Sequence, residues 1–439
     1  MKTTVDSDPG ANMFAIIERL YPICRSITGP GVRETMEIIS GHIPLSVVET
    51  PSGTEVFDWT VPKEWSIRDA YVADASGRRV IDFRAHNLHV LNYSAPIRAR
   101  MTLAALRTHL FTLPAQPDLI PYRTSYYAEN WGFCLSHRVL ESMQEGDYEV
   151  VIDSTLEDGA LTYGEYVLPG ETDDEILISA HTCHPSLAND NLSGIAVAVA
   201  LAQRLAERPA RKHTFRFLFA PGTIGAITWL ARNEARVNRI KHGLVLTGLG
   251  DSGDLVYKKS RRGDTMTDRA AAHVIGTRAR KGRVIPFNPY GYDERQYCSP
   301  GFDLAVGRIS RTPHGEFPEY HTSADNLSFV SPAQLTDSLA AVEEVIDVLE
   351  RNAVYENLNP KGEPRLGKRG LYRAIAGQTD SQHREMAMLW VLSGSDGQTS
   401  LLDIAETAHL SFAEIRAAAD ALAQAQLLEE RGGRRRPPG

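Results

Sequence analysis

Two histidines and an aspartate follow a short apolar segment in the middle of this chain. Residues 176–180 (ILISA) have the length and composition of a buried strand, which stops at His181. His184 comes one short turn later, and Asp190 lies in a polar loop before an apolar segment that is typical of a helix. Strand, polar loop and helix in this order place functional groups at the carboxyl end of a parallel sheet. Imidazole and carboxylate are ligands of Zn²⁺, so these groups form a candidate open metal site; the alternative is that they only cap the helix.

A second polar region, made of the segments 291–302 and 311–327, lies far downstream and ends just before the last long helix. His321 stands in one of its loops, from which it can return to the sheet edge and meet His181 and Asp190. Taken alone, each acidic residue of this region is typical of a salt-bridged surface group. A loop with so many polar, aromatic, glycine and proline residues is more typical of a site wall. The predicted metal ligands are His181, His184, Asp190 and His321.

The same region supplies groups that we expect to transfer protons and stabilise charge. A carboxylate near the metal would act as general base, and a guanidinium would hold a substrate carboxylate or an oxyanion. The predicted catalytic residues are Glu294, Arg295 and Glu319. Tyrosines of the aromatic segment 120–136 belong either to the core or to a pocket wall, and both interpretations stay open. The predicted substrate contacts are Tyr126, Tyr127, Asp293, Glu316 and Tyr320.

The composition is that of a globular protein with a large core. The chain has 439 residues, of which 42% are hydrophobic, and this length predicts two or three domains. No segment approaches the roughly 20 uninterrupted apolar residues of a membrane span, and the first residues do not resemble a signal peptide. The four cysteines show no CxxC spacing, which predicts a reduced, cytoplasmic setting.

The charge pattern points away from membranes and nucleic acids. The net charge of -8 gives no general attraction to either of these anionic partners. The basic run 431–439 is short and is typical of a solvated chain end. Lys258, Arg261 and Arg262 either border an anionic part of the substrate or simply face solvent.

Hydrophobic periodicity divides the chain into four parts. Short alternating runs from about residue 46 predict a β-rich insert, in which we expect Trp59, Trp65 and Tyr93 to be core residues and His86 and His89 to be structural. From residue 148, strands alternate with helices, which predicts an α/β fold with a mostly parallel sheet in a three-layer αβα arrangement. The predicted parts are 1–45, an N-terminal helical part of the catalytic domain; 46–105, the insert; 106–356, the catalytic domain; and 357–439, a linker and a winged helix-turn-helix.

The last part holds two helices that are joined by a short turn and followed by a hairpin-like end, an order that matches a winged helix. Its second helix, predicted over 411–425, carries Arg416 but also Glu414 and Asp420. A helix that reads DNA would bring more positive charge to the phosphates. We therefore expect a role in protein interaction or dimerisation, and the chain could form a homo-oligomer through this domain or through the insert.

Three segments together resemble the zinc-dependent aminopeptidases with co-catalytic metals. They are the strand that ends in His181, the ANDNLSG segment at 188–194 and the YHTSADN segment at 320–326. In those enzymes a strand-end histidine, the aspartate of an N-D-N-x-S-G motif and a late histidine bind metal. The resemblance implies these roles for His181, Asp190 and His321, and with them a zinc aminopeptidase-like fold.

Nearly the whole chain is similar to a group of bacterial aminopeptidase-like proteins with an N-terminal β insert and a C-terminal winged helix. The similarity rests on the segments SGTEVFDWTVPKEW, HNLHVLNYS, HTCHPSLANDNLSG, YGYDERQYCSPG and EYHTSADNL. Such proteins occur in polysaccharide and natural-product gene clusters, so the resemblance implies a biosynthetic setting of this kind.

The sequence departs from the co-catalytic aminopeptidases at three places. Gly222 and Thr223 stand where those enzymes carry a glutamate pair that supplies the base and a metal ligand. Thr247 or Gly248 stands at the position of a ligand aspartate, and Cys183 replaces an aspartate that orients the first histidine. Two ligands and the usual base are therefore missing, and we expect one Zn²⁺ per chain.

Three functional hypotheses follow. In the first, which we favour, Zn²⁺ bound by His181 or His184, Asp190 and His321 keeps a water in its fourth position, and Glu294 takes the proton. The chain would then cleave an amide bond in a small peptide or amino-acid conjugate. In the second, the site binds a peptide-like or sugar-amide ligand without turnover. In the third, the site is vestigial and the winged helix makes the chain a regulator or scaffold.

Overall fold

The structure is a computed structural model that describes residues 8–280, 282–371 and 379–431. It divides into two compact units, the first made of Met1–Gly263 and Ile285–Ala340 and the second of Asp264–Val284 and Ala341–Gly439. The metal ligands, catalytic residues and substrate contacts predicted from the sequence all belong to the first unit. Most of the basic run at the chain end, 432–439, lies outside the described residues.

A mixed sheet forms the centre of the first unit. Its strands run in the order β1-β10-β12-β11-β13-β16-β14. β11 is parallel to β12 and β13, and β13 is parallel to β16, whereas the pairs towards both edges are antiparallel. The apolar run predicted as a buried strand forms the middle of β11, whose residues are all buried. The bounds are β1 Ser46–Pro51, β10 Ala160–Leu168, β11 Glu175–His181, β12 Thr214–Ala220, β13 Ile240–Leu246, β14 Val256–Lys258 and β16 Val306–Ser310.

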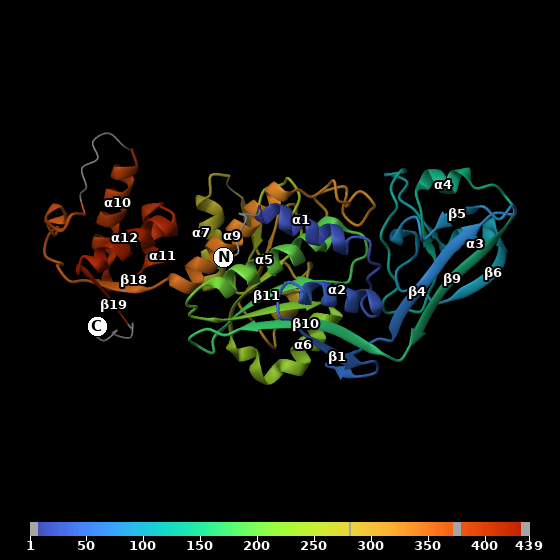
Figure 1. The fold of residues 1–439 in the computed structure, drawn as a ribbon, viewed down its shortest axis with the longest axis horizontal. Helices are drawn as coiled ribbons and strands as arrows, with labels where there is room; N and C mark the ends of the chain where they lie inside the picture. Colours follow the sequence, from blue (N-terminus) through green and yellow to red (C-terminus); the bar gives the residue numbers. More distant parts are fainter. Residues whose placement is uncertain (1–7, 281, 372–378, 432–439) are drawn as a thin grey trace, which may run out of the picture. The chain divides into compact units, whose positions relative to one another are not determined.

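Helices cover both faces of this sheet (Figure 1). α5 follows β11 and lies with α1 on one face, and α6 follows β12 on the opposite face. α5 is apolar on most of its circumference, which is typical of a helix packed between other elements. The predicted three-layer αβα fold is therefore confirmed. The bounds are α1 Pro9–Leu20, α2 Pro30–Ser40, α5 Gly194–Glu207, α6 Ile224–Asn233 and α9 Pro332–Arg351.

The β-rich insert contains an antiparallel sheet in the order β5-β4-β9-β6. Three of these strands lie within 46–105, but β9 comes later in the chain and extends the sheet past that predicted boundary. β9 is followed after a short turn by β10, so the chain passes directly from the insert sheet back into the central sheet. The bounds are β4 Glu64–Ala73, β5 Arg79–Asp82, β6 Ile97–Thr102 and β9 Asp147–Glu157.

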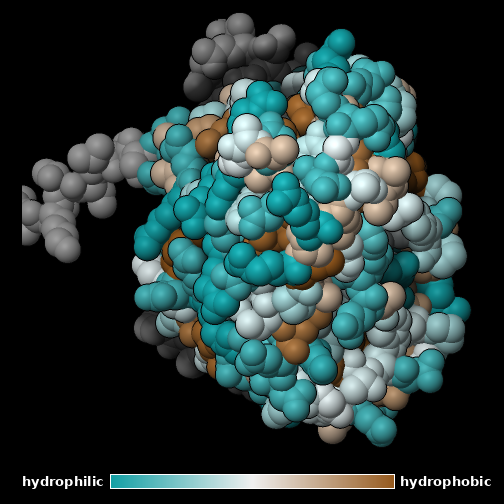
Figure 2. Space-filling model, turned by 90° about the vertical axis from the view of Figure 1, so that its right-hand side faces the viewer, coloured by the Kyte–Doolittle hydropathy of each residue, from teal (hydrophilic) through white to brown (hydrophobic). Residues whose placement is uncertain are grey.

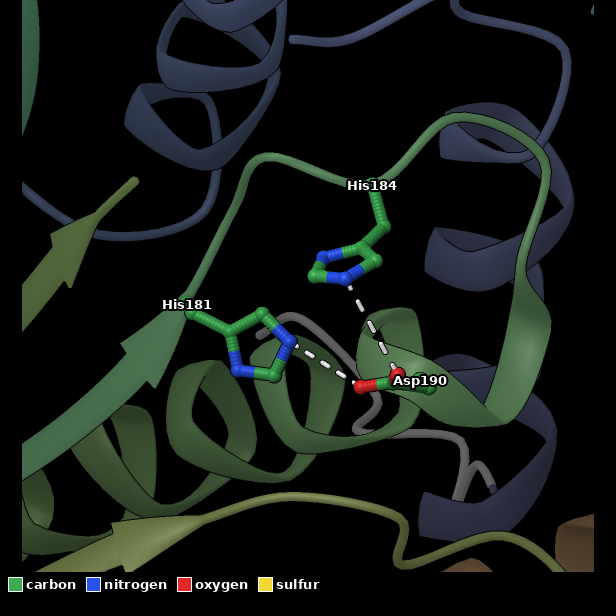
Figure 3. A group of neighbouring side chains, drawn as sticks. All are labelled: His181, His184 and Asp190. Atoms are coloured by element: carbon green, nitrogen blue, oxygen red, sulfur yellow. Dashed lines mark hydrogen bonds and ion pairs between the residues drawn. The ribbon is translucent and has the colours of Figure 1, made fainter. Parts of the chain in front are cut away.

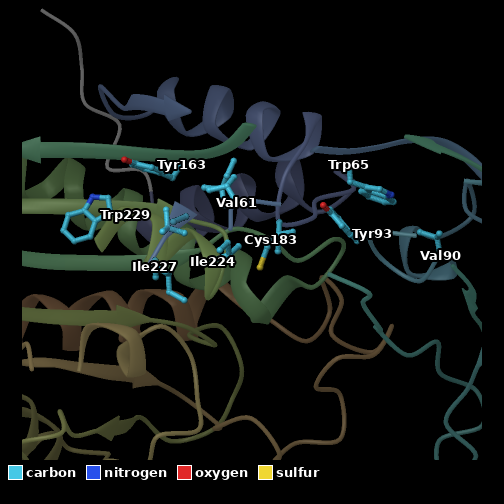
Figure 4. Close-up of a cluster of buried hydrophobic side chains, with 14 of the residues drawn as sticks. Val61, Trp65, Val90, Tyr93, Tyr163, Cys183, Ile224, Ile227 and Trp229 are labelled. Carbon is cyan, nitrogen blue, oxygen red and sulfur yellow. The ribbon is translucent and has the colours of Figure 1, made fainter. Parts of the chain in front are cut away.

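One hydrophobic cluster extends from the insert to α6 (Figure 4). Trp65 and Tyr93 belong to it, and the Trp65 indole N–H donates to the carbonyl oxygen of Ser94 at 2.9 Å. Trp59 does not, because it lies in a short hairpin, β2 (Glu55–Val56) and β3 (Trp59–Thr60), and is 37% exposed. The prediction that Trp59 is a core residue is therefore wrong. Its ring instead contacts the ring of Tyr127, with centroids 5.0 Å apart.

Figure 2 shows the face that is seen from the right-hand side of Figure 1, where the insert lies. Hydrophilic side chains dominate this face, and hydrophobic ones occur in small separate groups, as on an ordinary water-exposed surface. Among the described residues, no helix combines the length and the hydrophobicity that a membrane crossing requires.

The second unit contains the winged helix that the sequence predicts. α11 and α12 are joined by a short turn, and each begins with a capping box, formed by Ser400 with Asp403 and by Ser411 with Glu414. Its strands form a small sheet in the order β18-β17-β19, and a short 3-10 turn, Leu366–Arg369, lies within the predicted linker. The bounds are α7 Met266–Thr277, α10 Thr379–Gly394, α11 Leu401–Ala408, α12 Phe412–Gln424, β17 Val354–Asn357, β18 Asp396–Ser400 and β19 Leu428–Glu430.

Other short elements of the chain are α3 Leu103–Leu106, α4 His137–Ser142, α8 Glu294–Tyr297, β7 Leu110–Phe111, β8 Phe133–Cys134 and β15 Arg283–Ile285.

Candidate active site

A buried carboxylate at the carboxyl end of β11 is surrounded by three imidazoles. The Nε2 atom of His181 lies 3.0 Å from Asp190 Oδ1, and the Nε2 atom of His184 lies 3.9 Å from Asp190 Oδ2 (Figure 3). His321 approaches from the loop before α9 and places its Nε2 atom 3.0 Å from Asp190 Oδ2. The structure therefore brings together the four residues that we predicted as metal ligands.

Buried hydrogen bonds hold the turn that carries Asp190. This turn, Ala188–Ser193, connects β11 to α5. Asp325 accepts the backbone N–H groups of Asn189 at 2.6 Å and of Asp190 at 2.9 Å. Because Asp325 and His321 belong to the same loop, that loop supplies one candidate ligand and also orients another. Support of this kind from a surrounding layer of residues is typical of metal sites.

Asp190 and His184 are in the protonation states that bind metals. Burial by itself would raise the pKa of Asp190, but the neighbouring imidazoles hold that pKa well below its usual range. Burial lowers the pKa of His184 well below its usual value, against the opposing effect of Asp190. An ionised carboxylate and a neutral imidazole are the forms in which these side chains coordinate a cation.

The donor atoms fit a metal ion. His181, His184 and Asp190 each offer a ligand atom, and these atoms lie within 4.8 Å of one another. Tetrahedral Zn²⁺ with bonds of about 2.0–2.2 Å separates its ligand atoms by about 3.4 Å, so a small inward movement of the side chains is sufficient. The Nδ1 atom of His181 is buried without a hydrogen-bond partner, which shows that the surrounding protein does not satisfy this imidazole completely.

A pocket of ≈ 210 Å³ opens beside the cluster. Its volume is below the roughly 300–1,000 Å³ of sites for drug-sized ligands, which favours a small ligand. Tyrosines and histidines make up most of the wall. The lining residues are Tyr126, Tyr127, His181, Cys183, His184, Gly222, Thr223, Tyr290, Gly291, Tyr292, Asp293, His314 and Tyr320.

Asp293 is an acidic side chain in this wall. Its Oδ1 atom accepts the backbone N–H of Thr223 at 2.7 Å, at the start of α6. Burial raises the pKa of Asp293, although the nearby His181 acts in the opposite direction. Thr223 has a φ of 61°, a left-handed conformation that is uncommon for a β-branched residue. A pocket carboxyl group whose pKa is raised above its usual value is a candidate for proton transfer.

Glu294 is not positioned to act as general base, which corrects the prediction. It is fully buried, and its Oε1 atom lies 2.9 Å from the Nζ atom of Lys258, which is 2% exposed. Lys258 also donates to the carbonyl oxygen of Tyr290 at 2.9 Å. A carboxylate that is paired and sealed from the pocket does not reach a substrate or a water molecule there. Glu294 is unavailable because Lys258 on β14 packs against it at the start of α8.

The remaining predicted residues divide into two groups. Tyr126, Tyr127, Asp293 and Tyr320 line the pocket. Arg295, Glu316 and Glu319 do not line it. The Nη2 atom of Arg295 lies 3.3 Å from the Oγ1 atom of Thr223, a residue of the wall. Glu316 is exposed, and Glu319 is half-buried. The tyrosines and Asp293 therefore remain candidate substrate contacts, whereas Arg295 and the two glutamates lie outside the pocket wall.

Two of the three places at which the sequence departs from the co-catalytic enzymes lie in the wall, whereas Thr247 and Gly248 do not line it. Cys183, Gly222 and Thr223 all line the pocket. The Cys183 Sγ atom accepts the backbone N–H of Gly222 at 3.3 Å and lies 3.3 Å from His184 Nδ1. Burial raises the pKa of Cys183 to about 12, so it is a neutral thiol at physiological pH. The wall therefore has no carboxylate at these three positions.

Tyr290, Tyr292 and His314 contribute side chains to the wall that were not predicted from the sequence. The ring of Tyr292 stacks on that of His181, with centroids 5.3 Å apart. All three residues lie in or next to the polar, aromatic region that we interpreted as a site wall. Composition locates such a wall, but only the folded loop shows which of its side chains turn inward.

Sequence comparisons agree with this division of the chain. Residues 14–352 match a family described as "Domain of unknown function (DUF4910)", and residues 353–430 match a family described as winged helix-turn-helix. A protein from Clostridium acetobutylicum is 52% identical over 423 residues, which cover 96% of this chain and 97% of that protein. It is provisionally named a polysaccharide biosynthesis protein with aminopeptidase-like domain.

Solved structures are similar to different extents. A crystal structure of a protein from Clostridium acetobutylicum, provisionally described as a peptidase, has a TM-score of 0.91 and 51% identity and covers 96% of each chain. A zinc aminopeptidase from Bacillus subtilis has a TM-score of 0.59 and 13% identity, covering 78% of this chain and 95% of that chain. At this identity the second likeness shows the shared fold alone.

Proposed function

Because the chain belongs to an aminopeptidase-like family, the one described as domain of unknown function (DUF4910), we propose that it is a zinc-dependent amide hydrolase. Its substrate would be a small peptide or an amino-acid conjugate. The observation that carries this proposal is the convergence of His181, His184 and Asp190 beside a small pocket lined by tyrosines.

His181, His184 and Asp190 would hold the metal, and His321 would join them or orient Asp190. When bound, Zn²⁺ polarises an amide carbonyl and lowers the pKa of a water molecule. We expect one ion per chain, because the wall at Gly222 supplies no carboxylate for a second.

We assign proton transfer to Asp293 instead of Glu294. Asp293 lines the pocket, and its raised pKa brings it closer to neutral pH, where an acid–base group is most effective. The backbone N–H of Thr223 fixes the orientation of its carboxyl group. Tyr126, Tyr127 and Tyr320 would contact the substrate through their rings and hydroxyl groups.

The experiment is a hydrolysis assay with the zinc-loaded protein on dipeptides and aminoacyl amides. We expect Asp293→Asn to lower kcat by about 10²–10⁴-fold, the usual contribution of a positioned acid–base group, while zinc content stays unchanged. Glu319→Gln is the matched control, because this glutamate lies outside the pocket wall, and it should retain full activity. An active Asp293→Asn variant would remove Asp293 from the mechanism.

Binding without turnover is a second candidate function. It is favoured by Gly222 and Thr223, which line the pocket where the co-catalytic aminopeptidases place a glutamate pair. In that case the zinc-loaded protein would bind amides and hydrolyse none of them.

The proposed setting is the cytoplasm, because the four cysteines form no disulfide bond. The name of the relative from Clostridium acetobutylicum supports a place in polysaccharide biosynthesis, where an amide-bearing building block would be the substrate. A homo-oligomer formed through the winged helix or the insert is part of the same proposal.

A further inference from the structure

Arg308 is a buried cation without a carboxylate partner. It lies on β16 and is 1% exposed, and its Nε atom has no hydrogen-bond partner. Among the described residues its guanidinium forms no ion pair, and the one hydrogen bond of this side chain joins Nη1 to His314 Nδ1 at 3.5 Å. A guanidinium stays protonated in proteins, and an uncompensated buried charge is strongly unfavourable. Such a residue indicates that an anion completes the site in the working state.

The neighbouring charges do not compensate Arg308. Lys258 is its register partner across the pair of β14 and β16, but this lysine adds a second positive charge. Glu294 lies 2.9 Å from Lys258 and balances that lysine. Asp190, which also acts electrostatically on Tyr292 and His314, belongs to the metal-ligand cluster and forms no ion pair with Arg308. The positive charge of Arg308 therefore remains without a paired carboxylate on this side of the pocket.

Arg308 lies directly behind two residues of the pocket wall. Its guanidinium carbon is 5.4 Å from the ring centroid of Tyr292, and the second residue is His314, to which it is hydrogen-bonded. Both Tyr292 and His314 line the pocket. The positive charge therefore acts on the pocket through a thin, polarisable layer.

The contact with Arg308, at 3.5 Å a long hydrogen bond, favours one tautomer of His314. A guanidinium has only donors, so Nδ1 of His314 must accept, and the ring proton must then sit on Nε2. Burial lowers the pKa of His314, with Arg308 acting in the same direction, so the ring is neutral at physiological pH. His314 makes no further hydrogen bond among the described residues. Its Nε2–H is thus a free donor with a positive charge behind it.

We propose that His314 and Arg308 form an anion subsite in the pocket wall, which binds a carboxylate group of the substrate. His314 would donate to the carboxylate directly, and Arg308 would be a positioning residue that favours the donor tautomer and supplies the charge. Charge-assisted hydrogen bonds of this kind are the stronger ones in proteins.

The subsite lies one aromatic ring away from the metal-ligand cluster. Tyr292 stacks on His181 at 5.3 Å and has Arg308 at 5.4 Å from its ring. This spacing suits a carboxylate that is separated from the scissile amide by a few bonds, as in a dipeptide or an N-acylamino acid. The position of the amide rests on the proposed function, whereas the preference for a carboxylate does not.

The test is binding of hippurate and of its neutral amide, hippuramide, measured by calorimetry on the metal-free full-length protein. Without metal, a carboxylate cannot bind by direct coordination, and failure of zinc hydrolysis would leave this result unaffected. We expect the wild-type protein to bind hippurate about 10–100-fold more tightly than hippuramide, the range for hydrogen bonds to charged groups.

Three variants define the origin of the preference. Arg308→Gln and His314→Ala should each bring the affinity ratio to within about threefold of unity, and Arg308→Lys should keep part of the preference. Arg261→Gln is the matched control, because Arg261 pairs with Asp303 and is 42% exposed, and it should bind like the wild-type protein. His314 lies in a loop, so its variant tests the subsite even where a change in β16 disturbs folding.

Two results would overturn the proposal. The first is that the wild-type protein binds hippurate no more tightly than hippuramide, or binds neither of them. The other is a preference that survives both Arg308→Gln and His314→Ala. Inorganic phosphate and acetate serve as competitors of hippurate. If phosphate displaces hippurate at a lower concentration than acetate does, the subsite binds a phosphate ester and the proposed carboxylate ligand is wrong.

Discussion

The Nε2 atom of His321 lies 3.0 Å from the Oδ2 atom of Asp190, although 131 positions separate these residues in the chain. The contact joins the loop before α9 to the turn after β11. His321 has a φ of 54°, a conformation that costs free energy in a non-glycine residue and that is often found at functional sites. The fold thus maintains an unfavourable backbone conformation at the point where this imidazole meets the buried carboxylate.

The ion pair of Glu294 and Lys258 should be structural. Glu294→Gln leaves the lysine charge buried without a partner, so we expect the free energy of unfolding to fall by about 3–5 kcal/mol. Urea unfolding measures this change. Arg261→Gln breaks the exposed pair with Asp303 and should cost about 0–1 kcal/mol. A Glu294→Gln variant that is fully stable but inactive would return this residue to the catalytic machinery.

His86 should make the stability of the protein depend on pH. Its burial lowers its pKa from 6.5 to about 4, so between these values the unfolded chain binds more protons than the folded one. Stability contributed by neutral His86 is therefore present above pH 6.5 and is lost as the pH falls towards 4, by roughly 1–3 kcal/mol.

His86→Asn is the variant that isolates this effect. The Nδ1 atom of His86 accepts the backbone N–H of Leu88, and asparagine can accept the same hydrogen bond without titrating. Urea unfolding at pH 7 and pH 4.5 should show a smaller loss of stability for the variant than for the wild-type protein. Equal losses would assign the acid sensitivity to other groups.

The winged helix should bind duplex DNA weakly. On α12, Arg416 lies 2.8 Å from Asp420, and the same aspartate also lies 2.9 Å from Arg351. Both cations are already paired within the unit, and α12 carries no other lysine or arginine, so this helix offers no unpaired cation to a phosphate. Fluorescence anisotropy with a labelled duplex should give a Kd weaker than about 10⁻⁶ M at physiological salt. Nanomolar binding that weakens steeply between 50 and 200 mM salt would contradict this expectation.

Local patterns were sufficient for the parts of the site that lie close together in the chain. The apolar run before His181 and the polar loop around Asp190 predict a strand end and a turn, and β11 and the turn after it have this arrangement. His321 required more, because its distance from this segment makes spacing uninformative. Its place in a polar loop before the last long helix made the contact possible, and its resemblance to the late histidine of the zinc aminopeptidases made it the expected one.

Pairing between distant elements explains what could not be predicted. Glu294 looks like an available carboxylate in the sequence, since nothing near it shows that β14 brings Lys258 against it. Arg308 looks like one more strand residue, and its lack of a partner appears only once β14 and β16 are paired. Trp59 has the residue type of a core position, but its hairpin is too short for other elements to cover it.

Metal content tests the central claim most directly. The wild-type protein and the variants Asp190→Ala and His321→Ala are loaded with zinc, desalted and measured by elemental mass spectrometry, with circular dichroism to show that each chain is folded. We predict one zinc per wild-type chain and no stoichiometric zinc in either folded variant. A wild-type protein that retains no zinc, or variants that retain as much as the wild type, would contradict the proposed metal centre.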